Sequence, residues 1–133
     1  MEHSHTVLCI DDDTDDLELL HDALQKVGKD YKVIEAHDGL EGIRRLHELK
    51  NAGTLPCLIV LDVNMPRMDG RETFRMIKSE EQFEEIPVVV FSTSNSHVDQ
   101  LFFTGKNVEY IIKPVSVTPL EEIADRMLRH CGE

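Results

Sequence analysis

The sequence predicts an α/β fold in which helices cover both faces of a five-stranded parallel sheet. Short apolar runs that suit buried strands alternate along the chain with longer stretches of helical period. The apolar runs are continuous, as in strands that are buried on both faces of a sheet. Because parallel strands are joined by right-handed crossovers, we expect an open, doubly wound sheet.

The first half of the chain contains two strand–helix units. Residues 7–10 are predicted to form a buried strand, and residues 14–27 a helix with leucines on one face. Gly28 can end this helix. Residues 31–36 are rich in β-formers and predict a second strand. After a turn, residues 40–49 carry apolar side chains at helical spacing, and this helix should end near residues 51–53.

The third unit is the most apolar. Residues 57–61 predict a central strand, followed by a loop over residues 62–69. Asp69 can cap a helix that starts at Gly70, with Glu72 completing a capping box. The residues expected on the inner side of this helix are Phe74, Ile77 and Met76.

The last two strand–helix units differ in how clearly the sequence predicts their helices. Residues 87–91 predict a buried strand, and residues 95–105 a short helix suggested by Val98, Leu101 and Phe102. Residues 110–112 predict the last strand. A final helix should start at Thr118-Pro119-Leu120-Glu121, with a capping Thr and Pro in the first turn. Its inner face would carry Leu120, Ile123, Ala124, Met127 and Leu128.

Composition predicts one domain over residues 1–133, with a core from about residue 6 to residue 130. The net charge is −12 and Lys and Arg do not cluster, so direct nucleic-acid binding is not expected. No apolar run suits a membrane span or a signal peptide, which favours a cytoplasmic protein. We expect reduced cysteines, with Cys9 and Cys57 buried and Cys131 exposed.

Polar residues follow the predicted strands. Asp11 and Asp12 come after the first strand and Asp62 after the third, while residues 92–93 and 113–114 end the fourth and fifth. In a parallel sheet these groups share one edge, where ligands bind. Clustered carboxylates suit a divalent cation such as Mg²⁺, and a lysine and a hydroxyl can bind phosphoryl oxygens. The edge therefore predicts phosphoryl-transfer chemistry.

Several motifs make the chain resemble the receiver domains of two-component response regulators. They are Ile10-Asp11-Asp12-Asp13, Leu61-Asp62-Val63-Asn64-Met65-Pro66-Arg67-Met68-Asp69-Gly70, Val89-Val90-Phe91-Ser92-Thr93 and Ile112-Lys113-Pro114. The resemblance covers residues 6–130 and implies a flavodoxin-like receiver fold with strand order 2-1-3-4-5. The stretch 92–95 also resembles single-domain receivers that partner with bacterial phytochrome kinases.

The resemblance implies a phosphoacceptor and a metal site. Asp62 would accept the phosphoryl group. Mg²⁺ (or Mn²⁺) would be bound by the side chains of Asp12 and Asp62 and by the backbone carbonyl of Asn64, with Asp11 acting through water. We assign Asp13, Asp15 and Asp16 instead to an acidic helix start, which the helix dipole favours.

The resemblance also implies phosphate-binding and switch residues. Lys113 would pair with the acceptor carboxylate and then with the phosphate, with Ser92 and Thr93 beside it. Ser92 and Tyr110 would be the switch pair, and Thr93 stands where many relatives have a smaller residue. The bond before Pro114 is expected to be cis.

The implied function is a stand-alone response regulator without an output domain. A histidine kinase or a histidine phosphotransfer domain would phosphorylate it. The signal would leave through the face of the fourth helix, fifth strand and fifth helix, either in a monomer or in a weak homodimer. The downstream partner is not readable from the sequence. It would not be a turnover enzyme: a haloacid-dehalogenase-type phosphatase needs Asp-x-Asp, and Asn64 takes the second position. A phosphorylation-independent receiver-like binding module remains the alternative.

Overall fold

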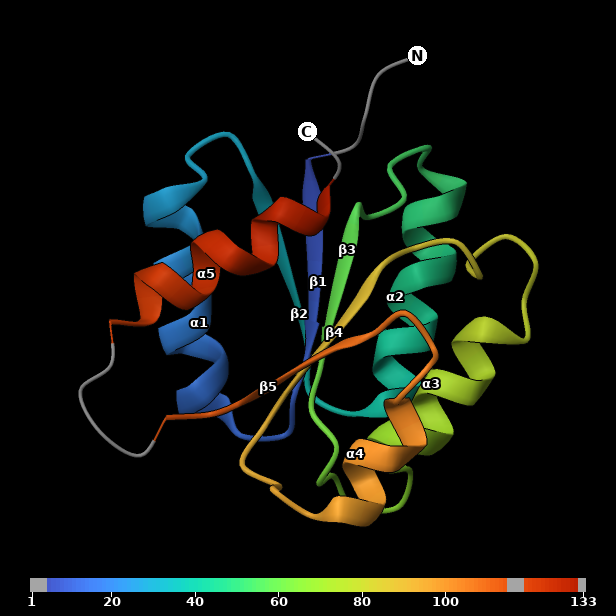
Figure 1. The fold of residues 1–133 in the computed structure, drawn as a ribbon. Coiled ribbons are helices and arrows are strands. Elements are labelled where there is room, and N and C mark those ends of the chain that lie inside the picture. The colour runs from blue at the N-terminus through green and yellow to red at the C-terminus, as the bar shows by residue number, and fades with distance from the viewer. Residues whose placement is uncertain (1–4, 115–118, 132–133) are drawn as a thin grey trace.

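A computed structural model shows a five-stranded parallel sheet with helices on both faces (Figure 1). It describes residues 5–114 and 119–131. The strand order is β2-β1-β3-β4-β5, which confirms the predicted doubly wound topology. The strands are β1 (Thr6–Ile10), β2 (Lys32–Ala36), β3 (Leu58–Leu61), β4 (Val88–Ser92) and β5 (Glu109–Ile112).

The helices divide between the two faces of the sheet. Figure 1 shows α1 and α5 side by side on one face, and α2, α3 and α4 on the other. A short 3₁₀ helix, η1 (Arg129–Cys131), follows α5. The helices are α1 (Thr14–Val27), α2 (Gly39–Asn51), α3 (Gly70–Lys78), α4 (His97–Phe103) and α5 (Leu120–Leu128).

Two apolar clusters lie on the two faces of the sheet. Val7 and Cys9 of β1 belong to the cluster under α1 and α5. Leu8 and Ile10 of the same strand belong to the cluster under α2, α3 and α4. Because successive strand side chains point to opposite faces, both faces need apolar residues. The continuous apolar runs in the sequence follow from this arrangement.

Side-chain caps fix where four of the helices begin. The carboxylates of Asp13, Asp38 and Asp69 accept hydrogen bonds from backbone N–H groups in the first turns of α1, α2 and α3. Ser96 caps α4 in the same way. The predicted cap at Asp69 is confirmed, because its carboxylate accepts the backbone N–H of Glu72 at 3.0 Å. The reciprocal hydrogen bond to the Glu72 side chain, which would complete a capping box, is not formed among the described residues. The predicted cap at Thr118 lies outside the described residues.

Helix α4 packs through its last residue, Phe103. Phe103 is buried and touches Phe74 and Phe102 edge to face. Val98 and Leu101, whose spacing suggested the helix, are 65% and 67% exposed. The helix prediction is confirmed, but the face that it buries is set by its last residue, because α4 is only 7 residues long.

The cysteine prediction is wrong for two of the three residues. Cys57 and Cys131 form a disulfide that joins the entry of β3 to the end of η1, with Cα atoms 4.8 Å apart. The folding of the chain brings together two cysteines that are 74 residues apart, which spacing alone could not reveal. Cys131 is therefore buried and not exposed. Cys9 is a free, buried thiol, as predicted.

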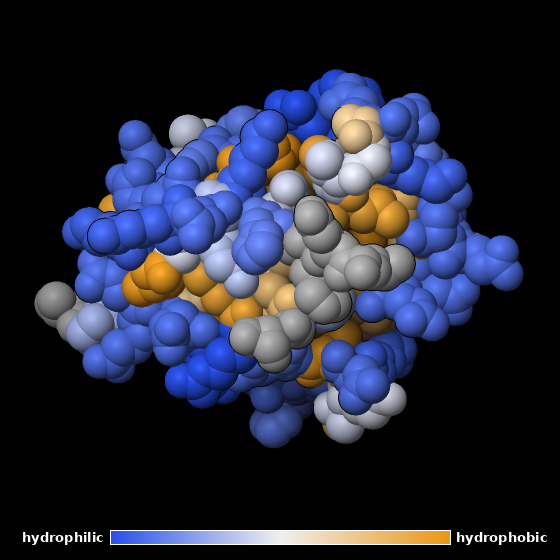
Figure 2. All heavy atoms as spheres, turned by 90° about the horizontal axis from the view of Figure 1, so that it is seen from above, coloured by the Kyte–Doolittle hydropathy of each residue, from blue (hydrophilic) through white to orange (hydrophobic). Residues whose placement is uncertain are grey.

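One face of the surface can be judged by its hydropathy (Figure 2). Seen from above the view of Figure 1, the surface is mainly hydrophilic, and apolar side chains show only in separate areas between polar ones (Figure 2). Within residues 5–114 and 119–131, no helix combines the length and the apolar character that crossing a membrane requires.

Candidate functional site

The carboxyl ends of the strands bring the predicted polar residues to one edge of the sheet. Ile10 and Leu61 are register partners in the β1–β3 pair, so Asp11 and Asp62 leave the sheet side by side. The backbone N–H of Asp62 donates to the carbonyl of Ile10 at 3.0 Å. On the other side, the N–H of Lys113 donates to the carbonyl of Ser92 at 2.8 Å. The parallel ladder therefore assembles the site.

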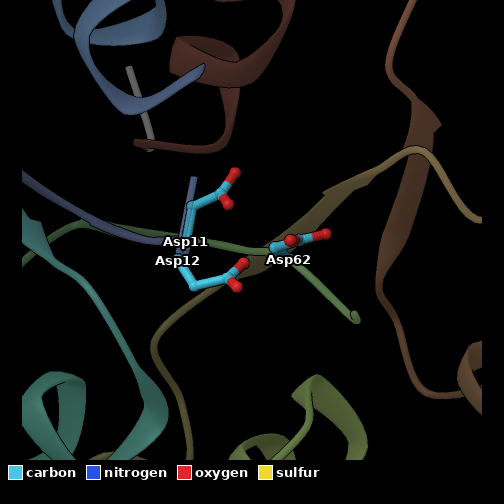
Figure 3. Close-up of side chains that lie close together, drawn as sticks. All are labelled: Asp11, Asp12 and Asp62. Atoms are coloured by element: carbon cyan, nitrogen blue, oxygen red, sulfur yellow. The ribbon is translucent and has the colours of Figure 1, made fainter. Parts of the chain in front are cut away.

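Three carboxylates meet at this edge. Oxygen atoms of Asp11, Asp12 and Asp62 lie within 4.8 Å of one another. Figure 3 shows Asp11 and Asp12 at the end of one strand, and the Asp12 carboxylate pointing toward Asp62. Asp11 and Asp62 are buried, whereas Asp12 is exposed. This is a hard-oxygen donor set that is open to solvent on one side, as a hydrated Mg²⁺ or Mn²⁺ requires.

The environment of Asp62 opposes its ionisation. Burial and the negative charge of Asp11 raise the pKa of Asp62 from 3.8 to about 6, although Lys113 and a hydrogen bond from Ser92 work in the other direction. The Asp62 carboxylate also accepts the backbone N–H of Val63 at 2.8 Å. A cation placed among the three carboxylates would relieve this repulsion.

Lys113 is buried and holds two acidic partners. Its Nζ lies 2.6 Å from Oδ2 of Asp11 and 2.8 Å from Oδ2 of Asp16. Burial disfavours the ammonium ion, but the hydrogen bonds to Asp11 and Asp16, together with the negative charges of Asp62 and Asp11, outweigh burial and raise the pKa of Lys113. Lys113 therefore remains a cation at neutral pH.

The expected direct ion pair between Lys113 and Asp62 is not formed among the described residues: every ion pair of Lys113 goes to Asp11 or Asp16. The physical reason is that Asp16 reaches the ammonium from the first turn of α1. Asp62 still acts on Lys113 through its charge.

The predicted switch residues lie next to the acceptor. Ser92 is fully buried at the end of β4, and its hydroxyl oxygen accepts the N–H of Ser94 at 3.2 Å. Thr93 is exposed beside it. Tyr110 on β5 is half-buried and its hydroxyl donates to the carbonyl of Ser94 at 2.9 Å. Tyr110 is thus joined to the loop that leaves β4, the same loop that Ser92 begins.

The loop after β3 has little freedom because α3 starts against it. A Cβ atom on Gly70 would lie 2.3 Å from the carbonyl oxygen of Asp62 and 2.7 Å from Cα of Val63. The N–H of Gly70 donates to the carbonyl of Val63 at 2.8 Å. Only glycine permits this approach, so Gly70 fixes the backbone of the acceptor residue. Asn64 is exposed in this loop, and the role of its carbonyl stays a prediction.

One backbone prediction is wrong. The peptide bonds of residues 5–114 and 119–131 are all trans, including the bond between Lys113 and Pro114. The trans form of a bond before proline is favoured by about 0.5–1 kcal/mol when the surroundings do not select the cis form.

Sequence reasoning missed Asp16, which it assigned to the acidic helix start. The capping role belongs to Asp13, whose carboxylate accepts the N–H of Asp16 at 3.0 Å. The side chains of a helix lean toward its N-terminus, so a residue of the first turn of α1 can reach back to the strand ends. That lean, combined with a buried lysine at the same edge, was the available signal.

Known proteins agree with this architecture. The chain is 29% identical to Sensor histidine kinase CheAY of Helicobacter pylori over 97% of its own length, but spans only 16% of that protein. It is 35% identical to Response regulator Rcp1 of Synechocystis over 96 residues, which are 70% of this chain and 65% of Rcp1.

Solved structures of response regulators share this fold. The phosphorylated cyanobacterial phytochrome response regulator RcpA superposes with a TM-score of 0.83 at 32% identity, covering 96% of this chain and 93% of RcpA. The Mn²⁺-bound form of Rcp1 has a TM-score of 0.78 at 28% identity, covering 92% and 91% of the two chains. The family model described as "Response regulator receiver domain" matches residues 7–125. The chain therefore belongs to the response regulator receiver domain family.

Proposed function

We propose that this receiver domain accepts a phosphoryl group on Asp62 from a histidine kinase or a histidine phosphotransfer domain, and that this switches its protein contacts. The observation that carries the proposal is a buried carboxylate, Asp62, next to a buried lysine cation and two further carboxylates. Asp62 is the only carboxylate of the three whose strand is central in the sheet and whose neighbour Ser92 can sense the phosphate.

The chemistry is a displacement at phosphorus. An oxygen of Asp62 forms the new P–O bond while the P–N bond of a phosphohistidine breaks, and the leaving imidazole nitrogen keeps that electron pair and takes a proton from solvent. Lys113 supplies positive charge to the phosphoryl oxygens. No second carboxylic acid follows Asp62 at the Asn64 position, which favours a stored acyl phosphate over rapid turnover. We therefore propose a switch and not a turnover enzyme.

The carboxylates fit a divalent cation. Asp12 and Asp62 would bind Mg²⁺ or Mn²⁺ directly, with the Asn64 carbonyl and, through water, Asp11. When bound, the cation neutralises charge that develops on the phosphoryl group. The raised pKa of Asp62 supports this assignment. Burial and the charge of Asp11 disfavour the ionised carboxylate, and a bound cation would stabilise it.

The output would pass through the face formed by α4, β5 and α5. Ser92 would bind the phosphoryl oxygens, and Tyr110 would leave its hydrogen bond to Ser94 and turn inward. Val98, Leu101 and Ile112 are exposed apolar residues on this face and could contact a protein partner or a second copy. A cytoplasmic location is part of the proposal, because that is where a cytosolic kinase domain would act.

The direct test uses acetyl phosphate and Mg²⁺. Intact-protein mass spectrometry should show the gain of one phosphoryl group in the wild type and no gain in Asp62→Asn. Asp69→Asn is the control, since it also removes one aspartate from the same loop but should still be labelled. Labelling of Asp62→Asn would overturn the assignment.

The metal requirement has its own test. Millimolar Mg²⁺ should raise the melting temperature of the wild type, and Asp12→Asn should reduce that rise. The alternative, a binding module that ignores phosphorylation, would be favoured if the wild type and Asp62→Asn bound the same partner equally with and without acetyl phosphate.

A further inference from the structure

Lys113 makes one ion pair with a residue that was not predicted to belong to the site. Besides Asp11 at the strand end, its ammonium contacts Asp16 on the first turn of α1 at 2.8 Å. The side chains of Lys113 and Asp11 are 9% exposed and that of Asp16 is 33% exposed. The Asp16 carboxylate is thus partly shielded and lies between the buried lysine and the solvent.

The two ion pairs leave the lysine with little spare capacity. An ammonium group has three N–H donors. Asp11 and Asp16 accept two of them, and within the described part of the chain Asp62 forms no ion pair with Lys113. A phosphoryl group on Asp62 would therefore have to share Lys113 with Asp16 or draw it away from Asp16.

We propose that Asp16 is a positioning residue that holds the Lys113 ammonium at the α1 side of the site and competes with the phosphoryl oxygens for it. The inference rests on the proposed phosphorylation of Asp62. In this proposal, α1 helps to set how strongly the phosphorylated state is favoured. Asp16 is not needed to cap α1, because Asp13 already caps this helix.

The competition follows from the charges. Asp11, Asp12, Asp16 and Asp62 carry four negative charges around one lysine, so the anions compete for a single ammonium. A charge-assisted hydrogen bond in a shielded site is stronger than one in water. Asp16→Asn keeps the size of the side chain but removes its charge, and Lys113 should then be freer to turn toward an anion on Asp62.

The test measures the binding of beryllofluoride, a phosphoryl analogue, in the presence of Mg²⁺ by isothermal titration. We expect Asp16→Asn to bind it roughly three- to tenfold more tightly than the wild type. Asp15→Asn is the matched control. Asp15 lies in the same first turn of α1, is exposed and makes no ion pair within the described residues, so the change removes an equal charge from the neighbouring position of that turn.

Asp15→Asn should bind beryllofluoride within about twofold of the wild type, because long-range effects of exposed charges are screened by salt. Asp16→Glu, which keeps the charge, should restore an affinity near that of the wild type. Thermal melting of the same variants reports a purely structural role of Asp16, which would lower the melting temperature without tightening binding.

The result that overturns the inference is an Asp16→Asn affinity equal to, or weaker than, that of Asp15→Asn. Failure of the proposed function is a different outcome: the wild type would then bind no beryllofluoride, or Asp62→Asn would bind it as well as the wild type does. The two failures are thus distinguished by variants at separate positions.

Discussion

At the scale of single residues, the site is a set of charges held in unfavourable surroundings. Asp11 and Asp62 are buried beside each other, and only Lys113 brings a positive charge to them from within the described site. The position of each group is set by the strand that it follows, even where this places like charges close together. Such an arrangement lowers the stability of the folded protein when no cation is bound. Clusters of groups with perturbed pKa values are common at functional sites.

The raised pKa of Asp62 predicts a pH dependence of stability in the metal-free protein. The unfolded chain ionises Asp62 near 3.8 and the folded protein near 6, so the folded state holds the proton more tightly. Stability should therefore fall as pH rises between these values and stay low above them. Relative to Asp62→Asn, the wild type should lose about 2–3 kcal/mol over this range.

Urea unfolding with EDTA, at several pH values from about 4 to about 7.5, measures this difference. The comparison with Asp62→Asn cancels the titration of the remaining groups. A difference between the two proteins that stays constant with pH would show that Asp62 is not perturbed in the folded state.

The inward-facing thiol of Cys9 is a contrasting case at the same scale. Burial, together with the charges of Glu35 and Asp11, raises its pKa strongly. It remains a neutral thiol at physiological pH and should react slowly with iodoacetamide, because the thiolate is the reactive form. Labelling of the folded protein, compared with the protein in urea, measures this protection.

At the scale of elements, the contact between the loop after β3 and the start of α3 positions the acceptor. Gly70→Ala should destabilise the protein by about 1–3 kcal/mol, because a Cβ atom there meets the backbone of Asp62 and Val63. It should also slow phosphorylation, since the backbone of Asp62 must shift. Glu72→Ala, which is exposed in the same helical turn, is the control and should leave phosphorylation unchanged.

Helix α4 offers a second element-scale prediction. Phe103→Ala should cost about 3–5 kcal/mol, because the side chain is buried against Phe74 and Phe102. Leu101→Ala changes an exposed side chain two positions earlier and should alter stability by less than about 0.5 kcal/mol. Chemical unfolding of both variants checks the assignment. Equal losses would mean that the inner face of α4 is misplaced.

The sequence predicted most elements because their signals are local. Apolar runs, the cap at Asp69 and the glycine at position 70 all act within a few residues. Contacts set by the tertiary fold were not predictable: the reach of Asp16 to Lys113 spans 97 residues, and the Cys57–Cys131 bond spans 74. The buried side of α4 was not clear from the apolar spacing for a different reason, since a helix of 7 residues has too few turns for a clear period.

At the scale of the whole molecule, the disulfide joins the sheet to the last helix. Cys57 lies at the entry of β3, at the opposite end of that strand from Asp62, and Cys131 follows α5. The bond therefore lies away from the phosphorylation site. Disulfides are rare in a reducing cytosol. The proposed cytoplasmic location therefore predicts that the fold also holds with both thiols reduced.

Reduction should lower stability without abolishing the site. Dithiothreitol, or Cys131→Ser, should destabilise the protein by about 2–4 kcal/mol, because a long loop is closed in the oxidised unfolded chain. Cys9→Ser removes the free thiol and is the control for general loss of thiols, although its own burial makes it mildly destabilising. Phosphorylation by acetyl phosphate should be retained in the reduced protein. An unchanged melting temperature on reduction would contradict this prediction.

The same bond also changes how the chain would respond to mechanical force. Pulled from its two ends, the oxidised protein cannot extend the segment between Cys57 and Cys131. These cysteines are separated by 74 positions in the sequence, or roughly 250 Å of contour length. That closed ring contains Asp62, Ser92 and Lys113, whereas Asp11 and Asp12 lie outside it, directly after β1. Force would therefore peel the acidic pair away from the acceptor while the other half of the site stayed within one covalent loop.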